Sequence, residues 1–194
     1  MATPLPTGLT KPQPQPNFEV RDPASGGVVA TVAACGAPEV EAAVAAADAA
    51  QKAWAQKTGK ERGRVLKAWH ALMAANADDL ATLLTLEAGK PWAEAAGEVA
   101  YAASFLEWFG EEAKRAYGET IPATLPGRRL LAIKQPVGVA AMITPWNFPS
   151  AMLTRKVQPS PRPLNTSPCA LALACPLPHT RLSPCTRSPL FSTL

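Results

Sequence analysis

One segment decides the expected fold class: Pro136-Val-Gly-Val-Ala-Ala-Met-Ile-Thr-Pro-Trp-Asn-Phe-Pro-Ser-Ala-Met-Leu-Thr-Arg-Lys-Val157. Its first part, residues 137–143, carries no charge and predicts a strand buried on both faces, as strands are in parallel α/β sheets. A helix is expected to begin near Ser150. Because ligands of open α/β sheets bind beyond the carboxyl ends of the strands, this order predicts an α/β fold with a site at the turn between strand and helix.

The turn in this segment carries the candidate chemistry. Pro145 and Pro149 restrict their own φ angles and favour extended geometry in the residues before them, so Trp146 and Asn147 are expected on a stiff turn. The side chain of Asn147 is a neutral amide with two N–H donors. At the end of a strand, such a donor is suited to stabilising an oxyanion, and we predict that role for it.

The residues before this segment predict a hairpin followed by helices. Two short β-capable runs, residues 18–21 and 28–32, flank a turn-rich connector. Apolar residues then recur at helical spacing from Pro38 to Tyr117. Thr58 followed by Glu61 predicts a capping box at the start of one of these helices.

The helix that follows Pro91 carries five carboxylates that could be read as a metal or acid/base cluster. Glu111 lies four residues before Arg115, however, and this spacing favours a solvated, ion-paired face. His70, on the helix that begins near Thr58, is expected at the surface because no acidic or cysteine partner is spaced to orient it. The carboxylates in question are Glu94, Glu98, Glu107, Glu111 and Glu112, and the same helix is expected to bury Val99, Ala103 and Leu106.

Both ends of the chain differ in composition from the part between them. Residues 1–17 contain five prolines and predict a disordered leader. Residues 158–194 contain eight prolines and no acid, glycine or lysine, which predicts a disordered tail of low complexity. Our hypothesis is that this tail is translated non-coding sequence, such as a retained intron, with a shifted reading frame and a genuine isoform as the alternatives. The spacing of its Cys169, Cys175, His179 and Cys185 fits no zinc-ligand pattern, so no metal site is expected.

Composition excludes several classes of partner. Three of the 19 basic residues lie in 158–194, which leaves 16 basic and 15 acidic residues in 1–157 and no basic stripe for nucleic acid. No apolar run is long enough to cross a membrane, and no signal or transit peptide is visible. Only Cys35 lies outside the tail, so no disulfide framework is implied. We expect a cytoplasmic protein, with a mitochondrial location open for a longer parent protein.

The segment Ile143-Thr-Pro-Trp-Asn-Phe-Pro149 resembles the signature of the NAD(P)-dependent aldehyde dehydrogenases. The resemblance covers residues 18–157 and implies the amino-terminal part of that fold, a helix-rich start of a Rossmann-like cofactor domain. Residues 118–136 match an extension through which the family oligomerises. Four further segments resemble the succinate-semialdehyde dehydrogenase branch: Thr85–Pro91, Ala102–Phe109, Tyr117–Pro122 and Ser150–Lys156.

This resemblance implies roles for individual residues. Asn147 matches the family's oxyanion-stabilising asparagine, and Arg155 matches an arginine that binds the distal carboxylate of the aldehyde substrate. A helix-surface ion pair is the alternative for Arg155. Four residues match positions that line the nicotinamide ribose of NAD or NADP: Ile143, Thr144, Pro145 and Trp146. The family's nucleophilic cysteine, general-base glutamate and cofactor-binding lysine have no match in the chain, so we expect these 194 residues alone to be inactive.

Two functions from different classes therefore stand. The first is an enzyme similar to succinate-semialdehyde dehydrogenase, with lactaldehyde or glutarate semialdehyde as neighbouring substrates. The second is a non-catalytic helical module that associates with full-length subunits, or with copies of itself, through residues 118–136. The choice between NAD and NADP stays open.

Overall fold

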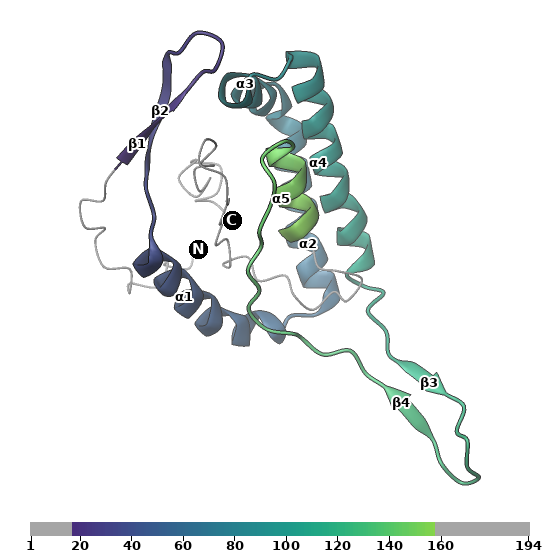
Figure 1. Cartoon of the computed structure of the whole chain (residues 1–194). Coiled ribbons are helices and arrows are strands. Elements are labelled where there is room, and N and C mark those ends of the chain that lie inside the picture. Colours follow the sequence, from purple (N-terminus) through teal and green to yellow (C-terminus); the bar gives the residue numbers. More distant parts are fainter. Residues whose placement is uncertain (1–16, 158–194) are drawn as a thin grey trace, which may run out of the picture.

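The computed structural model describes residues 17–157 and shows a helical body from which a narrow arm projects (Figure 1). The tail cysteines and His179 lie outside the described residues, as do the proline-rich ends. The elements, in chain order, are β1 (Asn17–Arg21), β2 (Val28–Ala33), α1 (Ala37–Ala55), α2 (Gly59–Ala75), α3 (Ala77–Ala88), α4 (Trp92–Glu112), β3 (Glu119–Ile121), β4 (Leu130–Ala132) and α5 (Pro149–Val157).

The predicted hairpin forms from β1 and β2, which pair antiparallel. Asp22 organises its turn: one carboxylate oxygen accepts from the Ala24 N–H at 2.9 Å and the other from the Ser25 hydroxyl at 2.6 Å. Gly26 adopts a φ of +73°, which glycine tolerates without strain. The hairpin turn reaches α3, because a Cβ added at Gly89 would lie 2.8 Å from the Pro23 ring.

The capping box predicted at the start of α2 is confirmed. The Glu61 N–H donates to the Thr58 hydroxyl at 3.3 Å, and the Thr58 N–H donates to the Glu61 carboxylate at 2.7 Å. Farther along α2, Gly63 lets α4 approach closely, since a Cβ there would lie 2.6 Å from the Gly110 carbonyl oxygen. α2 and α3 pack against α4, the longest helix in residues 17–157, and α5 packs against α4 as well (Figure 1).

The core lies where these helices meet. α4 buries the predicted side, and Leu106 is fully buried. The other members of the core cluster are Leu66, Met73, Ala81, Leu84, Ala95, Val99, Ala102, Ala103 and Ala151. No helix in the described part of the chain is long and apolar enough to cross a bilayer.

Two expectations about polar residues of the helices were wrong. His70 is half-buried, and its Nδ1 lies 3.0 Å from the carbonyl oxygen of Ala103 on α4, because the close packing of α2 and α4 covers it. Glu98 is buried rather than solvated. Glu111 does lie on an ion-paired face, but it pairs with Lys67 of α2 and with Lys114, while Arg115 pairs with Glu112.

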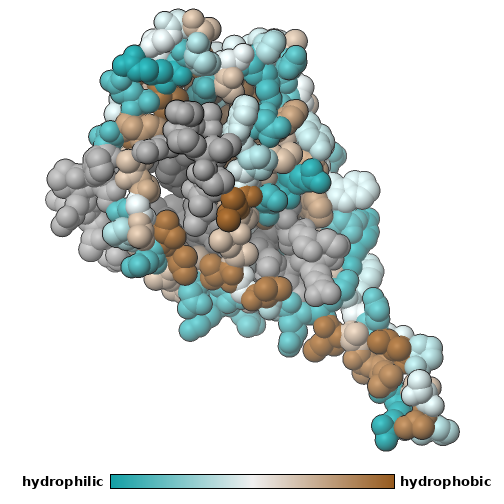
Figure 2. Space-filling view, in the orientation of Figure 1, coloured by the Kyte–Doolittle hydropathy of each residue, from teal (hydrophilic) through white to brown (hydrophobic). Residues whose placement is uncertain are grey.

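The arm, which we define as residues 114–143, leaves the end of α4 and returns to α5 (Figure 1). Its strands β3 and β4 form a two-stranded antiparallel ladder. Apolar side chains gather on its outer surface, as Figure 2 shows, and Leu131 is 72% exposed. Leu130 and Ile133 are exposed beside it.

The strand predicted over residues 137–143 does not form, and Val137 and Ile143 are exposed rather than buried. A strand needs neighbours to pair its backbone and cover its faces. Each of the two sheets in residues 17–157 is an antiparallel pair of strands, and neither sheet includes residues 137–143. The apolar pattern of 137–143 is therefore not matched by a partner strand in the described residues.

Candidate functional site

A turn lies between the arm and α5, where the two prolines predict it. Residues 146–148 form a bend, and α5 begins at Pro149, where a proline is well suited because the first helical N–H has no partner within the helix. The Met152 N–H donates to the Phe148 carbonyl oxygen at 2.9 Å. The helix was expected near Ser150, so this prediction is confirmed to within one residue.

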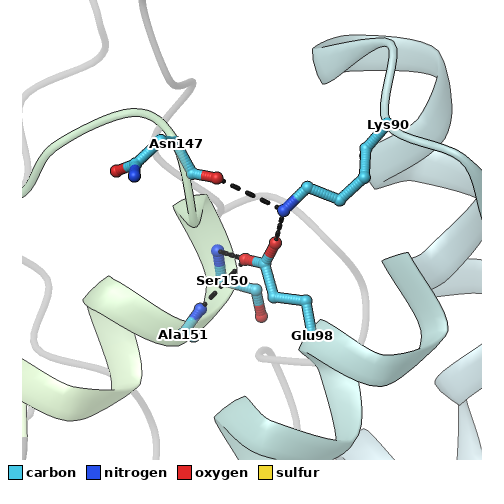
Figure 3. Close-up of polar contacts among 5 residues, drawn as sticks. All are labelled: Lys90, Glu98, Asn147, Ser150 and Ala151. Atoms are coloured by element: carbon cyan, nitrogen blue, oxygen red, sulfur yellow. Dashed lines mark hydrogen bonds and ion pairs between the residues drawn. The ribbon is translucent and has the colours of Figure 1, made fainter. Parts of the chain in front are cut away.

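A buried carboxylate holds the start of α5 (Figure 3). The Glu98 side chain on α4 is fully buried, and its Oε1 accepts from the Ser150 N–H at 2.9 Å and from the Ala151 N–H at 3.2 Å. These N–H groups belong to the first turn of a helix, where no intrahelical acceptor exists and the helix dipole favours a negative charge. Glu98 therefore acts as a cap supplied by a residue about 50 positions earlier in the chain.

Lys90 lies between this carboxylate and the turn. It forms an ion pair with Glu98 Oε2 and donates to the Asn147 carbonyl oxygen at 3.2 Å (Figure 3). Its ammonium also lies 4.2 Å from the centroid of the Phe148 ring, within cation–π range. Lys90 thus contacts both residues of the Asn147–Phe148 peptide, Asn147 through its carbonyl oxygen and Phe148 through its ring.

The side chain of Asn147 points away from Lys90 (Figure 3). The residue is exposed, and the contact that ties it to the body uses its backbone carbonyl. The backbone of the turn is therefore fixed while the amide N–H donors face outward. This arrangement suits the donor role predicted from the sequence.

Arg155 lies in the last turn of α5 and is exposed. The opposite side of α5 is buried against α4 through Ala151, Thr154 and Val157. Among residues 17–157 no ion pair involves Arg155, so the surface ion pair considered as its alternative role has no partner in that range. Its guanidinium and the amide of Asn147 are carried by one helix and the turn that precedes it.

The four residues expected at the nicotinamide ribose lie together before α5. Ile143, Pro145 and Trp146 are exposed and offer an apolar surface. Thr144 is 1% exposed, and its hydroxyl has no hydrogen-bond partner in the described part of the chain. A buried hydroxyl without a partner beside an open apolar surface fits a site completed by a bound group. These residues can therefore hold part of a nucleotide cofactor.

Sequence reasoning missed Glu98 and Lys90. The sequence predicts a solvated face for this carboxylate, and it includes Lys90 only within the segment Thr85–Pro91. The one signal that could have found them is the lysine directly after Gly89, eight residues before a glutamate that shares one side of its helix with Ala95 and Ala102. Among the described residues, no group of three potential metal ligands lies close together.

The sequence model of one protein family, the aldehyde dehydrogenase family, matches residues 9–161 of the chain. The chain belongs to the aldehyde dehydrogenase family. The family predicted from the sequence is thus confirmed, and the sequence of the Asn147 turn belongs to the matched region.

Similar aldehyde dehydrogenases show which branch the chain resembles. It is 58% identical over 143 residues to glutarate-semialdehyde dehydrogenase of Pseudomonas aeruginosa, covering 74% of this chain and 30% of that protein. It is 54% identical, with the same coverage, to the NADP(+) succinate-semialdehyde dehydrogenase of Escherichia coli. The crystal structure of succinate-semialdehyde dehydrogenase from Burkholderia pseudomallei matches with a TM-score of 0.73 and 51% identity, over 79% of this chain and 31% of that one.

These matches confirm the fold class as the amino-terminal part of an aldehyde dehydrogenase fold, rich in helices and with small sheets. The chain spans about 30% of the length of the curated relatives that it matches.

Proposed function

We propose that this sequence forms the amino-terminal part of the active site of an NAD(P)-dependent semialdehyde dehydrogenase, acting on succinate semialdehyde or a close homologue. The observation that carries the proposal is the outward-facing amide of Asn147 on a turn that Lys90 and Glu98 hold in place. The relatives named for succinate- and glutarate-semialdehyde support the substrate class.

The chain's own chemical contribution is to stabilise negative charge on the substrate. When a thiolate attacks an aldehyde carbon, the carbonyl oxygen becomes an oxyanion. An N–H of Asn147 donates to this oxygen, and because the turn is fixed beforehand, little reorganisation accompanies the reaction. Removing one such donor typically costs about 10²–10³ in kcat.

A nicotinamide cofactor supplies the hydride acceptor when it is bound. Ile143, Pro145 and Trp146 would hold its nicotinamide–ribose end, and the Thr144 hydroxyl lies buried beside them. The relative from Escherichia coli carries NADP(+) in its name, and NAD remains the second candidate for this chain.

Residues 17–157 do not include the nucleophilic cysteine or the general-base glutamate that the family resemblance implies, so we propose that the 194 residues alone are inactive. Purified chain mixed with NAD or NADP and succinate semialdehyde should give no increase in absorbance from the reduced cofactor. Turnover that Asn147→Ala abolishes would contradict this part of the proposal.

The positive test is a hybrid enzyme in which residues 1–157 of this chain are joined to the remaining sequence of the Pseudomonas aeruginosa relative. The hybrid should oxidise succinate semialdehyde or glutarate semialdehyde, and Asn147→Ala should lower its kcat by about 10²–10³. A hybrid that folds and binds cofactor but keeps its kcat after Asn147→Ala would refute the role of Asn147.

In the same hybrid, Arg155→Ala should lower kcat/KM for succinate semialdehyde mainly through KM. A guanidinium–carboxylate pair contributes about 1.5–3 kcal/mol, which corresponds to a loss of about 10- to 150-fold. Propanal has no distal carboxylate and should be oxidised as before. Lys156→Ala, which removes the neighbouring exposed charge, is the matched control and should change neither substrate. Equal losses on both aldehydes would make Arg155 structural.

The arm supports a second candidate function, association with other subunits. Leu131 and Ile133 are exposed, and each strand of the two-stranded ladder leaves one edge without a neighbour among the described residues. We propose that residues 118–136 pair with another aldehyde dehydrogenase subunit or a second copy of this chain. Co-purification with a full-length subunit that is lost on deleting 118–136 would support this function, and unchanged co-purification would refute it.

A further inference from the structure

The buried ion pair beside the turn has a geometry that links it to Asn147. The Glu98 side chain is fully buried and that of Lys90 is 13% exposed. A buried ion pair often contributes little net stability, because desolvation of both charges offsets their attraction. The reason for this pair is therefore better sought in the position of the groups that it contacts.

Its contacts lie on the carboxyl-terminal side of the Asn147 α-carbon. Lys90 binds the Asn147 carbonyl oxygen and lies over the Phe148 ring, while Glu98 accepts the N–H groups of Ser150 and Ala151. The Asn147 carbonyl and three of the next four residues are thereby tied to α4 and to the residues just before it. The side-chain amide is not among these contacts and points the other way (Figure 3).

We propose that Glu98 and Lys90 are positioning residues that set the direction of the Asn147 amide for the oxyanion. This inference rests on the proposed function of Asn147. Lys90 fixes the peptide that follows Asn147, and Glu98 fixes both the start of α5 and, through the ion pair, Lys90 itself. Neither residue contacts the substrate.

A direct catalytic role for Glu98 does not fit the contacts. One carboxylate oxygen accepts two backbone N–H groups and the other pairs with Lys90, so both oxygens are engaged. A general base must reach the proton that it removes, and this buried side chain faces the interior between α4 and α5.

The first measurement uses the full 194-residue chain and does not depend on catalysis. In Glu98→Gln the amide oxygen can still accept both N–H groups, but the negative charge that strengthens these bonds and holds Lys90 is lost. Hydrogen exchange of the Ser150 and Ala151 amides should become about tenfold faster or more. Glu94→Gln, an exposed carboxylate on the same helix, is the control and should leave both rates unchanged. Unchanged exchange in Glu98→Gln would overturn the inference.

The second measurement uses the hybrid enzyme. A misplacement of about 1 Å can cost about 10² in rate, so Glu98→Gln and Lys90→Met should each lower kcat by about 10- to 100-fold with little change in KM. Lys90→Arg keeps the charge and should recover part of this loss. Circular dichroism melts select folded variants, and Lys90→Met serves as the test if Glu98→Gln does not fold.

A double variant separates positioning from general damage. If Glu98 acts through Asn147, adding Glu98→Gln to Asn147→Ala should cost less than threefold further, because the group being positioned is already absent. A further loss as large as in the single variant would overturn the inference while leaving the role of Asn147 intact. If Asn147→Ala alone has no effect, the proposed function fails, and the hydrogen-exchange result still reports on the contact.

Discussion

The helical body, formed by α2, α3, α4 and α5, and the arm contain similar apolar side chains but bury them very differently. Leu106 in the body is fully buried, whereas Leu131 in the arm is 72% exposed. In the body, α2, α3 and α5 each pack against α4, and the core lies between them, although Trp108 on the outer side of α4 stays exposed. In the arm, β3 and β4 meet only each other among the described elements.

The difference shows that apolar content does not by itself decide burial. Helices that follow one another in the sequence can cover each other's apolar stripes, because each stripe is formed by residues within a few helical turns. A strand depends on neighbours for both its backbone and its faces, so an apolar strand pattern indicates a need for partners without supplying them.

The largest expected effect is the difference in stability loss between two leucine-to-alanine variants, one in each region. Leu106→Ala leaves a cavity in the core between helices and should lower the free energy of unfolding by about 2–5 kcal/mol. Leu131→Ala removes a side chain that is already in water and should change it by less than about 0.5 kcal/mol. Urea unfolding followed by circular dichroism measures both. Comparable losses would mean that the arm is packed in solution, and the contrast between the regions would be wrong.

Two glycines sharpen the description of the body. Gly63→Ala places a Cβ 2.6 Å from the Gly110 carbonyl oxygen, which forces α2 and α4 apart and should cost about 1–3 kcal/mol. Gly97→Ala, inside α4, meets nothing within 4 Å and should stabilise the chain by up to about 1 kcal/mol. The same urea titration should therefore shift in opposite directions. A stabilising Gly63→Ala would show that the two helices do not cross as closely as described.

Local sequence signals predicted the hairpin and several features of the body. The Thr58 capping box, the hairpin turn at Asp22 and the buried side of α4 each depend on residues within a few positions of one another. The match of residues 143–149 to one family likewise used a single short segment. These features could be predicted because their physical causes are contained in the local sequence.

Features that depend on distant segments could not be predicted in this way. Nothing near Glu98 in the sequence distinguishes it from other helical carboxylates. The N–H groups that it binds belong to α5, about 50 residues later in the chain. His70 is covered by α4 in the same manner. The strand predicted over residues 137–143 failed for the related reason that its pairing depends on other strands. The periodicity of a segment predicts which of its faces is apolar, but it does not predict which other element packs against that face.

The smallest expected effect concerns Glu87, near the end of α3. Burial raises the pKa of its carboxyl above the usual range, and a negative charge near a helix carboxyl terminus is unfavourable as well. A raised pKa in the folded state means that the folded chain holds this proton more tightly than the unfolded chain. The stability from this group is therefore complete below the ordinary glutamate pKa and is lost as the pH rises through the raised value.

Glu87→Gln removes this penalty, so the variant should melt above the wild type near neutral pH, and the difference should vanish at about pH 4, where the wild-type carboxyl is protonated. The shift should be a few degrees at most, because Glu87 is only half-buried and water screens its charge. Glu119→Gln, on the exposed strand β3 of the arm, is the matched control and should leave the melting temperature unchanged at every pH. A difference at Glu87 that is the same at pH 4 and pH 7 would show that the substitution acts through packing, because only the loss of a titrating charge makes the gain depend on pH.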